Sequence, residues 1–464
     1  MFVSAKMRVI TDETGAYTEL PGLLTPGGVL TPLLDYCLSR SHDRSLAWMD
    51  KVVRSVQMFL EYMHCNPLQK DTHLLFRNFA QRLYGGTFDP ETGLDPSGLG
   101  WPARSAEDGR HIITNLTYFF DWLGVERPAA ARLNPKYSGD SFDRICDEAA
   151  YQYRRDKALL GHTWAENLPA SAGGRRVRAQ RTPLVSNVDP PAFPDDQFID
   201  LLTNGFKVGG RYDYRGILIT LLLHGAGFRE SEPFHLYIDD VVPDPHNPNS
   251  AIVRIHHPVQ GDAPAHWKDT RGRSRRGNRA AYLSEKFGLV PRTQLLDTRA
   301  AGWKGGMHDG RYYKEAYWFQ PEFGALFLRV WRKYLYEVAR TDRLHPFAFI
   351  NLSREPIGEM YCLGQYNKAH AAACKRIGLK VGKALGTTPH GHRHAYGRRL
   401  RTAGVDRAFI KKFMHHASLE SQEPYTQATS KEVQLELQAA ALRLGRATGS
   451  ADESQEMTQL LNLD

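Results

Sequence analysis

Three alternating histidines and a group of arginines occupy the segment TPHGHRHAYGRRLRTAG at residues 388–404. His390 and His394 are four residues apart, so a helix would place both on one face, as in the HExxH zinc motif. Position 391 is glycine, so the glutamate that acts as general base in that motif is missing. From these residues alone, a histidine-rich metal site, a solvated basic helix and a catalytic segment all remain open.

Two other segments carry residue types that suit chemistry on a phosphate. Arg229 lies in the segment GAGFRESEP at 225–233, directly after a strongly apolar stretch. His416 lies in the segment HHASLESQEPYTQ at 415–427 and precedes Tyr425 by nine positions. In chain order the sequence therefore offers an arginine, an H-x-x-R-H group, a further histidine and a tyrosine.

Breaking a phosphodiester bond of DNA requires a nucleophile, a clamp for the non-bridging oxygens and a proton for the leaving 5′-oxygen. The Tyr425 phenol, with an ordinary pKa near about 10, is a modest nucleophile until its surroundings lower the barrier. Arg229 and Arg393 can each present forked donors to phosphate oxygens and stabilise charge that grows in the transition state. His390 is a candidate base for the phenol proton, and His416 can donate to the phosphate. Such a reaction would leave a 3′-phosphotyrosyl link and require no metal.

At these residues the sequence resembles the tyrosine recombinase family, the phage-type integrases. Residues 227–232 match the family's arginine turn, and residues 390–394 match its H-x-L-R-H box. Residues 415–425 keep the family's spacing from the last histidine to the tyrosine. Two positions depart from the pattern: His392 stands where leucine is usual, and His415 stands where glycine is usual.

The resemblance implies a site-specific recombinase or integrase that cuts and rejoins DNA strands through a 3′-phosphotyrosyl intermediate. It covers about residues 195–430, and a narrower resemblance to the GmtY-like recombinases indicates a bacterial mobile element. The catalytic residues that it implies are Arg229, Lys304, His390, Arg393, His416 and Tyr425. Family members protonate the leaving oxygen with a lysine of a β-hairpin, and Lys304, in a glycine-rich turn, is favoured over Lys268 for this role. His394 is implied to be a buried support of the box.

Two arginine-rich stretches add candidates for contact with the DNA backbone. The first lies in PASAGGRRVRAQRTPLVSNVDPPAFP at 169–194 and the second in KDTRGRSRRGNR at 268–279. Either stretch would also suit a solvated loop, but arginines in such number favour sequence-independent binding to phosphates. The predicted DNA-binding residues are Arg175, Arg176, Arg178, Arg271, Arg273, Arg275 and Arg276.

The composition is that of a globular protein with an acidic partner. Among 464 residues, 60 lysines and arginines exceed 51 acidic residues, for a formal net charge of +9, which favours double-stranded DNA as the partner. The five cysteines are scattered without a CxxC pair, which argues against a disulfide framework or a zinc cluster. The longest mostly aliphatic run, Ile217–Leu223, is too short for a membrane span. We therefore expect a cytoplasmic, nucleoid-associated protein without a metal or other cofactor.

The elements that must position these residues are mostly helical. In the first third, apolar residues recur at helical spacing around a glycine- and proline-rich interruption at 85–102, and one helix is expected to end at Gly124. The expected helices are 45–63, 141–164, 195–204, 321–340, 360–377, 390–403, 406–414 and 430–445, and the expected strands are 234–241 and 251–257.

The expected fold is therefore mostly α with a small β-sheet. A helical N-terminal DNA-binding (core-binding) domain would span residues 1–168, followed by a basic, extended linker at 169–194. An α+β catalytic domain would span 195–446, with a polar tail at 447–464. In the family, the helix after the tyrosine often docks on a neighbouring protomer, which implies a dimer or tetramer on DNA. Element-encoded accessory proteins are further candidate partners.

Three other functions share parts of the pattern. A type IB-like topoisomerase also uses a tyrosine with arginines, but the H-x-x-R-H box and the compact spacing favour the recombinase. A non-catalytic DNA-binding protein is disfavoured because the five strongest catalytic positions are all retained. A histidine-rich metalloprotein would use His390 and His394 as ligands, and stoichiometric zinc in the purified chain would identify it.

Overall fold

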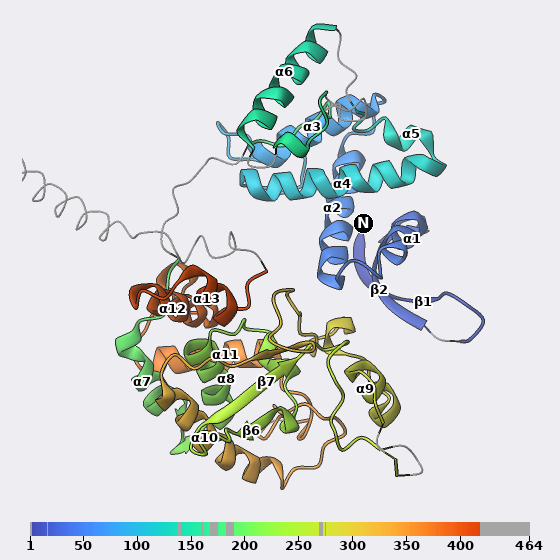
Figure 1. Cartoon of the computed structure of the whole chain (residues 1–464). Helices are drawn as coiled ribbons and strands as arrows, with labels where there is room; N and C mark the ends of the chain where they lie inside the picture. The colour runs from blue at the N-terminus through green and yellow to red at the C-terminus, as the bar shows by residue number, and fades with distance from the viewer. Residues whose placement is uncertain are drawn as a thin grey trace, which may run out of the picture. The chain divides into compact units, whose positions relative to one another are not determined.

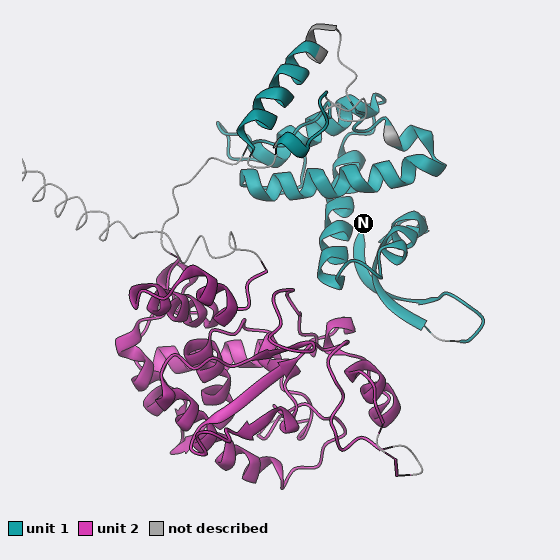
Figure 2. Cartoon of the chain, viewed as in Figure 1, with its two compact units in different colours: residues 1–184 teal, residues 185–464 magenta. Residues whose placement is uncertain are grey.

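The chain forms two compact units, residues 1–184 and residues 185–464 (Figure 2). The computed structural model describes residues 2–15, 17–136, 141–158, 161–167, 175–181, 190–268, 272–273, 275–353 and 355–417. Each unit has its own buried apolar core, as expected for a chain of this length. Within these described ranges, no helix is long and apolar enough to cross a membrane.

The first unit begins with a β-sheet. Strands β1 (Val3–Ile10), β2 (Tyr17–Thr25) and β3 (Gly28–Val29) pair antiparallel in the order β1-β2-β3. Half-buried and exposed side chains alternate along most of β1, as on a strand with one face turned to solvent. The first third was predicted to be a helical bundle, and that prediction missed the sheet at residues 3–29.

Helices make up the rest of the first unit (Figure 1). They are α1 (Thr31–Ser39), α2 (Leu46–Cys65), α3 (Thr72–Gly85), α4 (Ala106–Glu126), α5 (Pro128–Ala131), α6 (Ser141–Lys157) and the 3₁₀ turn η1 (Gly161–Thr163). The Phe59 ring packs edge to face on Phe79 and Phe120 in the core. The prediction that a helix ends at Gly124 was wrong, because α4 continues to Glu126, just before the proline that begins α5.

The described part of the arginine-rich stretch 169–194 packs against the first unit. Val177 is buried in the core of that unit, and its backbone N–H and carbonyl both bond to the Asn134 side chain, at 3.0 and 3.2 Å. Arg175 forms an isolated β-bridge with Lys136. Residues 175–181 are therefore part of the first unit and are not an extended connection.

The second unit surrounds a small sheet with helices (Figure 1). Its helices are α7 (Phe198–Asp200), α8 (Tyr214–Ala226), α9 (Arg279–Phe287), α10 (Pro321–Val338), α11 (Leu363–Arg376), α12 (Pro389–Thr402) and α13 (Arg407–Phe413). Shorter turns are η2 (Asp195–Gln197), η3 (Leu201–Gly205), η4 (Glu232–His235), η5 (Ile238–Asp240), η6 (Arg292–Gln294) and η7 (Lys383–Leu385). The strands are β4 (Lys207–Val208), β5 (Arg211–Tyr212), β6 (Val241–Pro243), β7 (Ala251–His256) and β8 (Tyr313–Glu315), with antiparallel pairs β4-β5, β6-β7 and β7-β8.

Helix α8 is the centre of the second unit. All its residues from Gly216 to Ala226 are buried, and it packs against α10, α11 and α12. A helix that is apolar on every face is stable only inside a core. The prediction of a mostly helical fold with a small sheet is confirmed. The strand expected at 234–241 is wrong, because 3₁₀ turns occupy most of it, and the helix expected at 430–445 lies outside the described residues.

Candidate active site

Arg229 follows the buried helix α8. The helix ends at Ala226 and is capped by Gly227, whose φ of +68° suits glycine and where an added Cβ would lie 2.3 Å from the Tyr396 ring. Phe228 is fully buried, whereas the Arg229 side chain is 16% exposed. A helix end and a close contact with α12 thus fix the point at which Arg229 leaves the core.

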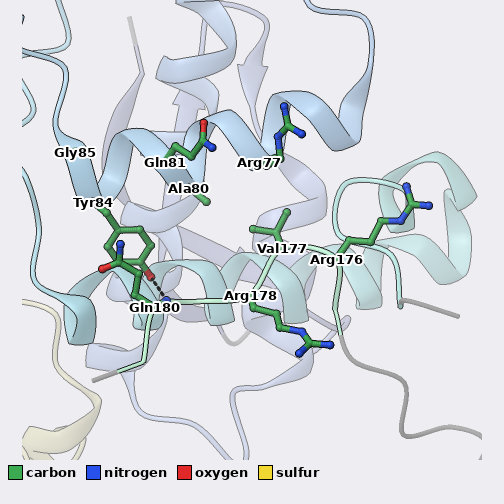
Figure 3. A pocket seen from close by; sticks show the side chains of 9 residues that line it. All are labelled: Arg77, Ala80, Gln81, Tyr84, Gly85, Arg176, Val177, Arg178 and Gln180. Atoms are coloured by element: carbon green, nitrogen blue, oxygen red, sulfur yellow. Dashed lines mark hydrogen bonds between the residues drawn. The ribbon is translucent and has the colours of Figure 1, made fainter. Parts of the chain in front are cut away.

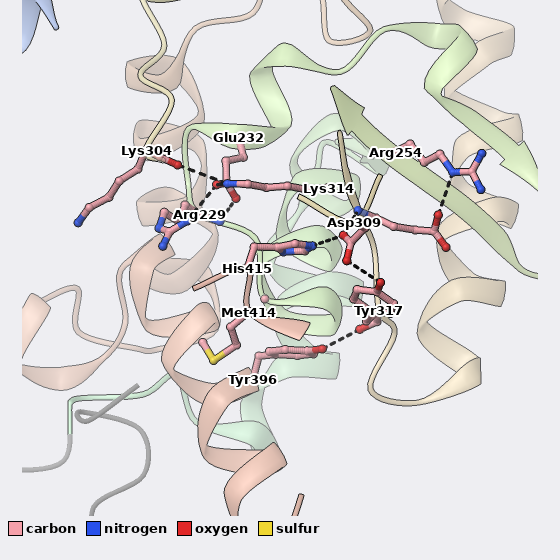
Figure 4. A network of polar contacts seen from close by, with 12 residues as sticks. Arg229, Glu232, Arg254, Lys304, Asp309, Lys314, Tyr317, Tyr396, Met414 and His415 are labelled. Atoms are coloured by element: carbon pink, nitrogen blue, oxygen red, sulfur yellow. Dashed lines mark hydrogen bonds and ion pairs between the residues drawn. The ribbon is translucent and has the colours of Figure 1, made fainter. Parts of the chain in front are cut away.

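Glu232 orients Arg229 and pairs with a buried lysine (Figure 4). Glu232 Oε2 accepts the Arg229 backbone N–H at 2.8 Å, and Oε1 lies 3.2 Å from Arg229 Nη1 and 2.6 Å from Lys314 Nζ. The side chains of Glu232 and Lys314 are both fully buried. Burial alone would raise the pKa of Glu232, but the charges of Lys314 and Arg229 outweigh it and hold the pKa at about 2. The carboxylate is therefore ionised and acts as a fixed anchor.

Arg393 lies on α12 and is only 2% exposed. Its Nη1 donates to the Gly227 carbonyl, and its Nη2 donates to the Met414 carbonyl at 2.7 Å. These carbonyls belong to the segments that carry Arg229 and His416. The guanidinium therefore ties three separated segments of chain together beside the site.

His390 and His394 are neighbours on α12, as their spacing predicted. Their ring centroids are 4.4 Å apart and the ring planes meet at 83°. Desolvation, followed by the charges of Arg393 and Lys304, lowers the pKa of His390 to about 4. Desolvation likewise lowers the pKa of His394 to about 3. Both rings are therefore neutral at neutral pH, and His390 can accept a proton.

His392, the middle histidine, points into the core and completes a chain of buried rings. Its Nδ1 lies 3.1 Å from His224 Nδ1, its Nε2 lies 2.8 Å from His370 Nε2, and Phe193 stacks on it at 4.2 Å. Arg399 always donates, and its Nη1 lies 2.6 Å from His224 Nε2, so each ring in turn donates to the next. Burial lowers the pKa of all three histidines, that of His370 to about 3. The alternating histidines thus divide between the site and the core.

His416 follows α13 and is 2% exposed. Its backbone N–H donates to the Lys411 carbonyl at 2.9 Å. Burial, followed by the charges of Arg393 and Arg229, lowers the pKa of His416 to about 3. The charges of both guanidiniums thus act on this ring, which is neutral, and a neutral imidazole has one N–H that can serve as a donor.

Lys304 lies on the connection from β7 to β8, whereas Lys314 lies in β8 itself (Figure 4). Lys304 is exposed, and its side chain extends away from the buried pair of Glu232 and Lys314. The charge of Lys304 is among those that lower the pKa of His390. Lys314, which the sequence did not single out, donates to the Lys304 carbonyl at 3.3 Å and so supports the backbone of this turn.

The site thus gathers residues from separated segments of the second unit. The expected catalytic residues that lie together are Arg229, Lys304, His390, Arg393 and His416. Tyr425 and the predicted DNA contact Arg271 lie outside the described residues. In the described part of the chain, no group of three or more His, Cys, Asp or Glu side chains is arranged to hold a metal ion.

The arginines of the first basic stretch differ in their surroundings. Arg176 and Arg178 are exposed and line an open groove of about 480 Å³ on the first unit, together with Arg77 of α3 (Figure 3). Arg175 instead pairs with Asp121 and donates to a backbone carbonyl at 2.9 Å. Of the three predicted contacts in this stretch, Arg176 and Arg178 are the better placed to meet a ligand.

The second basic stretch also contains both exposed and structural arginines. Arg273, Arg275 and Arg276 are exposed, and Arg275 pairs with Glu285 of α9. Arg279, which was not among the predicted contacts, is 2% exposed, and its charge is paired with that of the buried Asp240. The end of this stretch is therefore structural.

Comparisons with known proteins give a family and a set of similar structures. The model of the phage integrase family matches residues 328–432. No curated protein matches the sequence. Similar solved structures include the XerH site-specific recombinase bound to its difH substrate in a pre-cleavage complex, at 12% identity over 89% of this chain and 83% of that chain, with a TM-score of 0.47. They also include the Tn1549 transposon integrase in complex with transposon right-end DNA, at 14% identity over 83% of this chain and 99% of that chain, with a TM-score of 0.33. At such TM-scores these likenesses carry no argument about function.

Proposed function

The chain belongs to the phage integrase family through residues 328–432, and on that premise we propose that it is a site-specific recombinase acting through a phosphotyrosyl intermediate. The matched residues include α12, with His390 and Arg393, as well as His416 and Tyr425. Arg229 lies outside the matched residues. Arg393 donates to the carbonyl of Gly227, two residues before Arg229, and so ties the segment of Arg229 to the same site. The proposal therefore draws on residues within and beyond the matched segment.

The observation that carries this proposal is the convergence of two guanidiniums and two neutral imidazoles. Arg393 donates to the carbonyls of Gly227 and Met414, which lie two residues before Arg229 and His416, and it shares α12 with His390. The charges of both arginines also lower the pKa of both histidines. Glu232 is neutralised by its own buried lysine and does not oppose an anion. Forked donors and imidazole N–H groups together suit the non-bridging oxygens of one phosphate.

The reaction needs no energy beyond that of the phosphodiester. The Tyr425 phenolic oxygen attacks the scissile phosphorus, so that a P–O(Tyr) bond forms while the bond to the 5′-oxygen breaks. The phenol proton passes to His390, which is neutral before reaction, and Lys304 supplies a proton to the leaving 5′-oxygen. Attack by another 5′-hydroxyl on the phosphotyrosyl bond reverses these steps and rejoins the strand.

Covalent trapping tests this proposal. The protein is mixed with a nicked duplex that carries the element's end sequence, so that the short cleaved strand diffuses away and the adduct accumulates. We expect a protein–DNA adduct that resists denaturation, and Tyr425→Phe should abolish it because the variant lacks the attacking oxygen. An adduct of equal yield in Tyr425→Phe would show that another residue is the nucleophile.

We further propose that double-stranded DNA contacts the arginine-lined groove of the first unit. Arg77, Arg176 and Arg178 place three positive charges along one groove, which suits successive phosphates of a backbone. We propose in addition that the protein assembles as a dimer or tetramer on DNA. It would originate from a bacterial mobile element, and accessory proteins encoded by that element would be further partners. The exposed residues Arg273 and Arg276 are additional candidates for backbone contact.

A further inference from the structure

His415 occupies a backbone conformation that suits glycine. Its φ is +53°, in the left-handed region, and Tyr312 is the other described non-glycine residue with a positive φ. The His415 side chain is fully buried. A buried histidine in this conformation carries a backbone cost that glycine would avoid, which points to a contact that its side chain makes.

The imidazole of His415 contacts Asp309 and two aromatic rings, and Figure 4 shows it beside Asp309 and Tyr317. Its Nε2 lies 2.7 Å from Asp309 Oδ2, and the Asp309 side chain is only 6% exposed. The ring stacks on Phe228 at 5.6 Å and on Tyr317 at 6.0 Å. The Tyr317 hydroxyl donates to Asp309 Oδ1 at 2.6 Å. The ring therefore has one fixed position.

Asp309 belongs to the connection between β7 and β8 that also carries Lys304. Asp309 closes a turn with β8, since its Oδ2 accepts the Glu315 N–H at 2.8 Å and its N–H donates to the Tyr313 carbonyl at 3.0 Å. Gly306 packs on the backbone of His415, where an added Cβ would lie 2.2 Å from the His415 carbonyl oxygen. The connection thus touches His415 at two points shortly after Lys304.

The three segments that meet at this ring each carry a polar group of the site. Phe228 directly precedes Arg229, His415 directly precedes His416, and Lys304 lies two residues before Gly306. We propose that the His415–Asp309 pair is a latch that holds the β7–β8 connection against Arg229 and Arg393. Lys304 is thereby placed to protonate the leaving 5′-oxygen. This inference rests on the proposed strand-cleavage reaction.

Within that reaction, His415 and Asp309 are positioning residues. Burial alone would raise the pKa of Asp309, but its bonds to His415 and Tyr317 lower it overall, so the carboxylate is ionised and available as an acceptor. Lys304 needs such support because its own side chain is exposed. A small displacement of an acid from its acceptor slows the step that it serves.

The variant His415→Gly tests the latch without straining the backbone. Glycine favours the observed φ, so the variant is expected to fold, while the bond to Asp309 is lost. Single-turnover cleavage is measured on two suicide DNAs, one with the natural 5′-oxygen leaving group and one with a 5′-sulfur, which leaves without protonation. We expect cleavage at oxygen to slow by about tenfold to 10²-fold, and cleavage at sulfur to stay within about twofold of the wild-type rate.

Two further variants complete the comparison. Asp309→Asn removes the charge at the other end of the latch and should show the same selective loss at oxygen. Tyr312→Gly also replaces a large side chain at a positive φ on the same connection, but Tyr312 is 47% exposed, so both substrates should be cleaved normally.

The latch is wrong if His415→Gly cleaves both substrates at wild-type rates, or if it loses both rates equally. Failure of the wild-type chain to cleave either DNA would overturn the proposed strand-cleavage function itself. If only the latch is wrong, the wild-type chain still cleaves both DNAs, and His415→Gly shows no selective loss at the 5′-oxygen.

Discussion

At the scale of single residues, the site is organised by Glu232. This buried carboxylate fixes the backbone and the guanidinium of Arg229 and neutralises Lys314. Lys314 in turn holds the carbonyl of Lys304, the proposed acid. A fully buried ion pair adds little net stability, but removing one partner leaves an uncompensated charge in the core. Glu232 therefore affects both stability and the geometry of the clamp.

The variant Glu232→Gln should lower the free energy of unfolding by about 3–5 kcal/mol, because Lys314 would remain buried without its counter-charge. Urea denaturation followed by tryptophan fluorescence measures this change. The double variant Glu232→Gln/Lys314→Met restores neutrality and should be more stable than Glu232→Gln alone. If the double variant loses as much free energy of unfolding as Glu232→Gln and Lys314→Met lose together, the two side chains are not coupled.

The identity of the general acid is a second question at this scale. Lys304→Ala should slow cleavage of DNA with a 5′-oxygen leaving group by about 10²–10⁴-fold, and a 5′-sulfur leaving group should restore the rate. Lys268→Ala is the matched control, since Lys268 is the other lysine that the sequence offers for this role. Rescue by sulfur in Lys268→Ala, with none in Lys304→Ala, would reverse the assignment.

Residue patterns predicted the polar groups of the site better than their supports. Arg229, His390, Arg393 and His416 were predicted because their short segments resemble the arginine turn and the H-x-L-R-H box of tyrosine recombinases, and because arginine and histidine suit contact with a phosphate. The Lys314–Glu232 pair joins positions 82 residues apart in the sequence. Such a contact depends on how β8 folds back, and no local pattern contains that information.

At the scale of elements, the buried histidine chain fixes α12 against its neighbours. His224 belongs to α8, His370 to α11 and His392 to α12. Their hydrogen bonds align the helix that leads to Arg229 with the helix that carries Arg393. Each ring donates in one direction along the chain, which requires all three to be neutral.

Acid should weaken this packing. The pKa of these buried histidines is lowered in the folded state, so their full contribution is present above about pH 6.5, the ordinary histidine pKa, and is lost as the pH falls below it. Between pH 7 and pH 5, His392→Leu should lose about 2 kcal/mol less unfolding free energy than the wild type, because one protonatable group is gone. Denaturation midpoints at several pH values measure this, and equal pH dependence would contradict it.

Helical periodicity predicted most long helices, whereas short strands escaped it. Helices α2 and α10 are long, and each has a clear stripe of apolar residues that is buried in the core of its unit. Strand β1 has one solvated face, and β2 contains Pro21 and Gly22, which are unfavourable within a strand, so the hairpin carries a weak strand signal. Residues 234–241 contain aromatic and branched residues typical of strands, but Pro233 and two aspartates favour 3₁₀ turns there.

At the scale of the whole molecule, positive charge is spread over two units that each offer exposed arginines. The formal net charge of +9 is moderate, so local grouping decides where an acidic ligand binds. Arg176 and Arg178 lie in the groove of the first unit, whereas the proposed phosphate clamp belongs to the second unit. Binding and cleavage should therefore be separable by mutation.

The salt dependence of DNA binding tests this separation. Arg178→Ala should reduce the slope of log affinity against log salt by about one, because one phosphate contact is lost. Arg175→Ala is the matched control: its guanidinium pairs with Asp121, so the slope should change little. Binding isotherms at several salt concentrations give both slopes. If Arg178→Ala and Arg175→Ala reduce the slope equally, the groove is not where DNA binds.

The central claim is that Tyr425 becomes covalently joined to DNA within the clamp of Arg229 and Arg393. Mass spectrometry of proteolysed adduct, prepared on nicked DNA, identifies the modified residue and the linked end. We predict a nucleotide attached through its 3′-phosphate to Tyr425, with a free 5′-hydroxyl on the released strand. A link to another residue, or through a 5′-phosphate, would contradict the account.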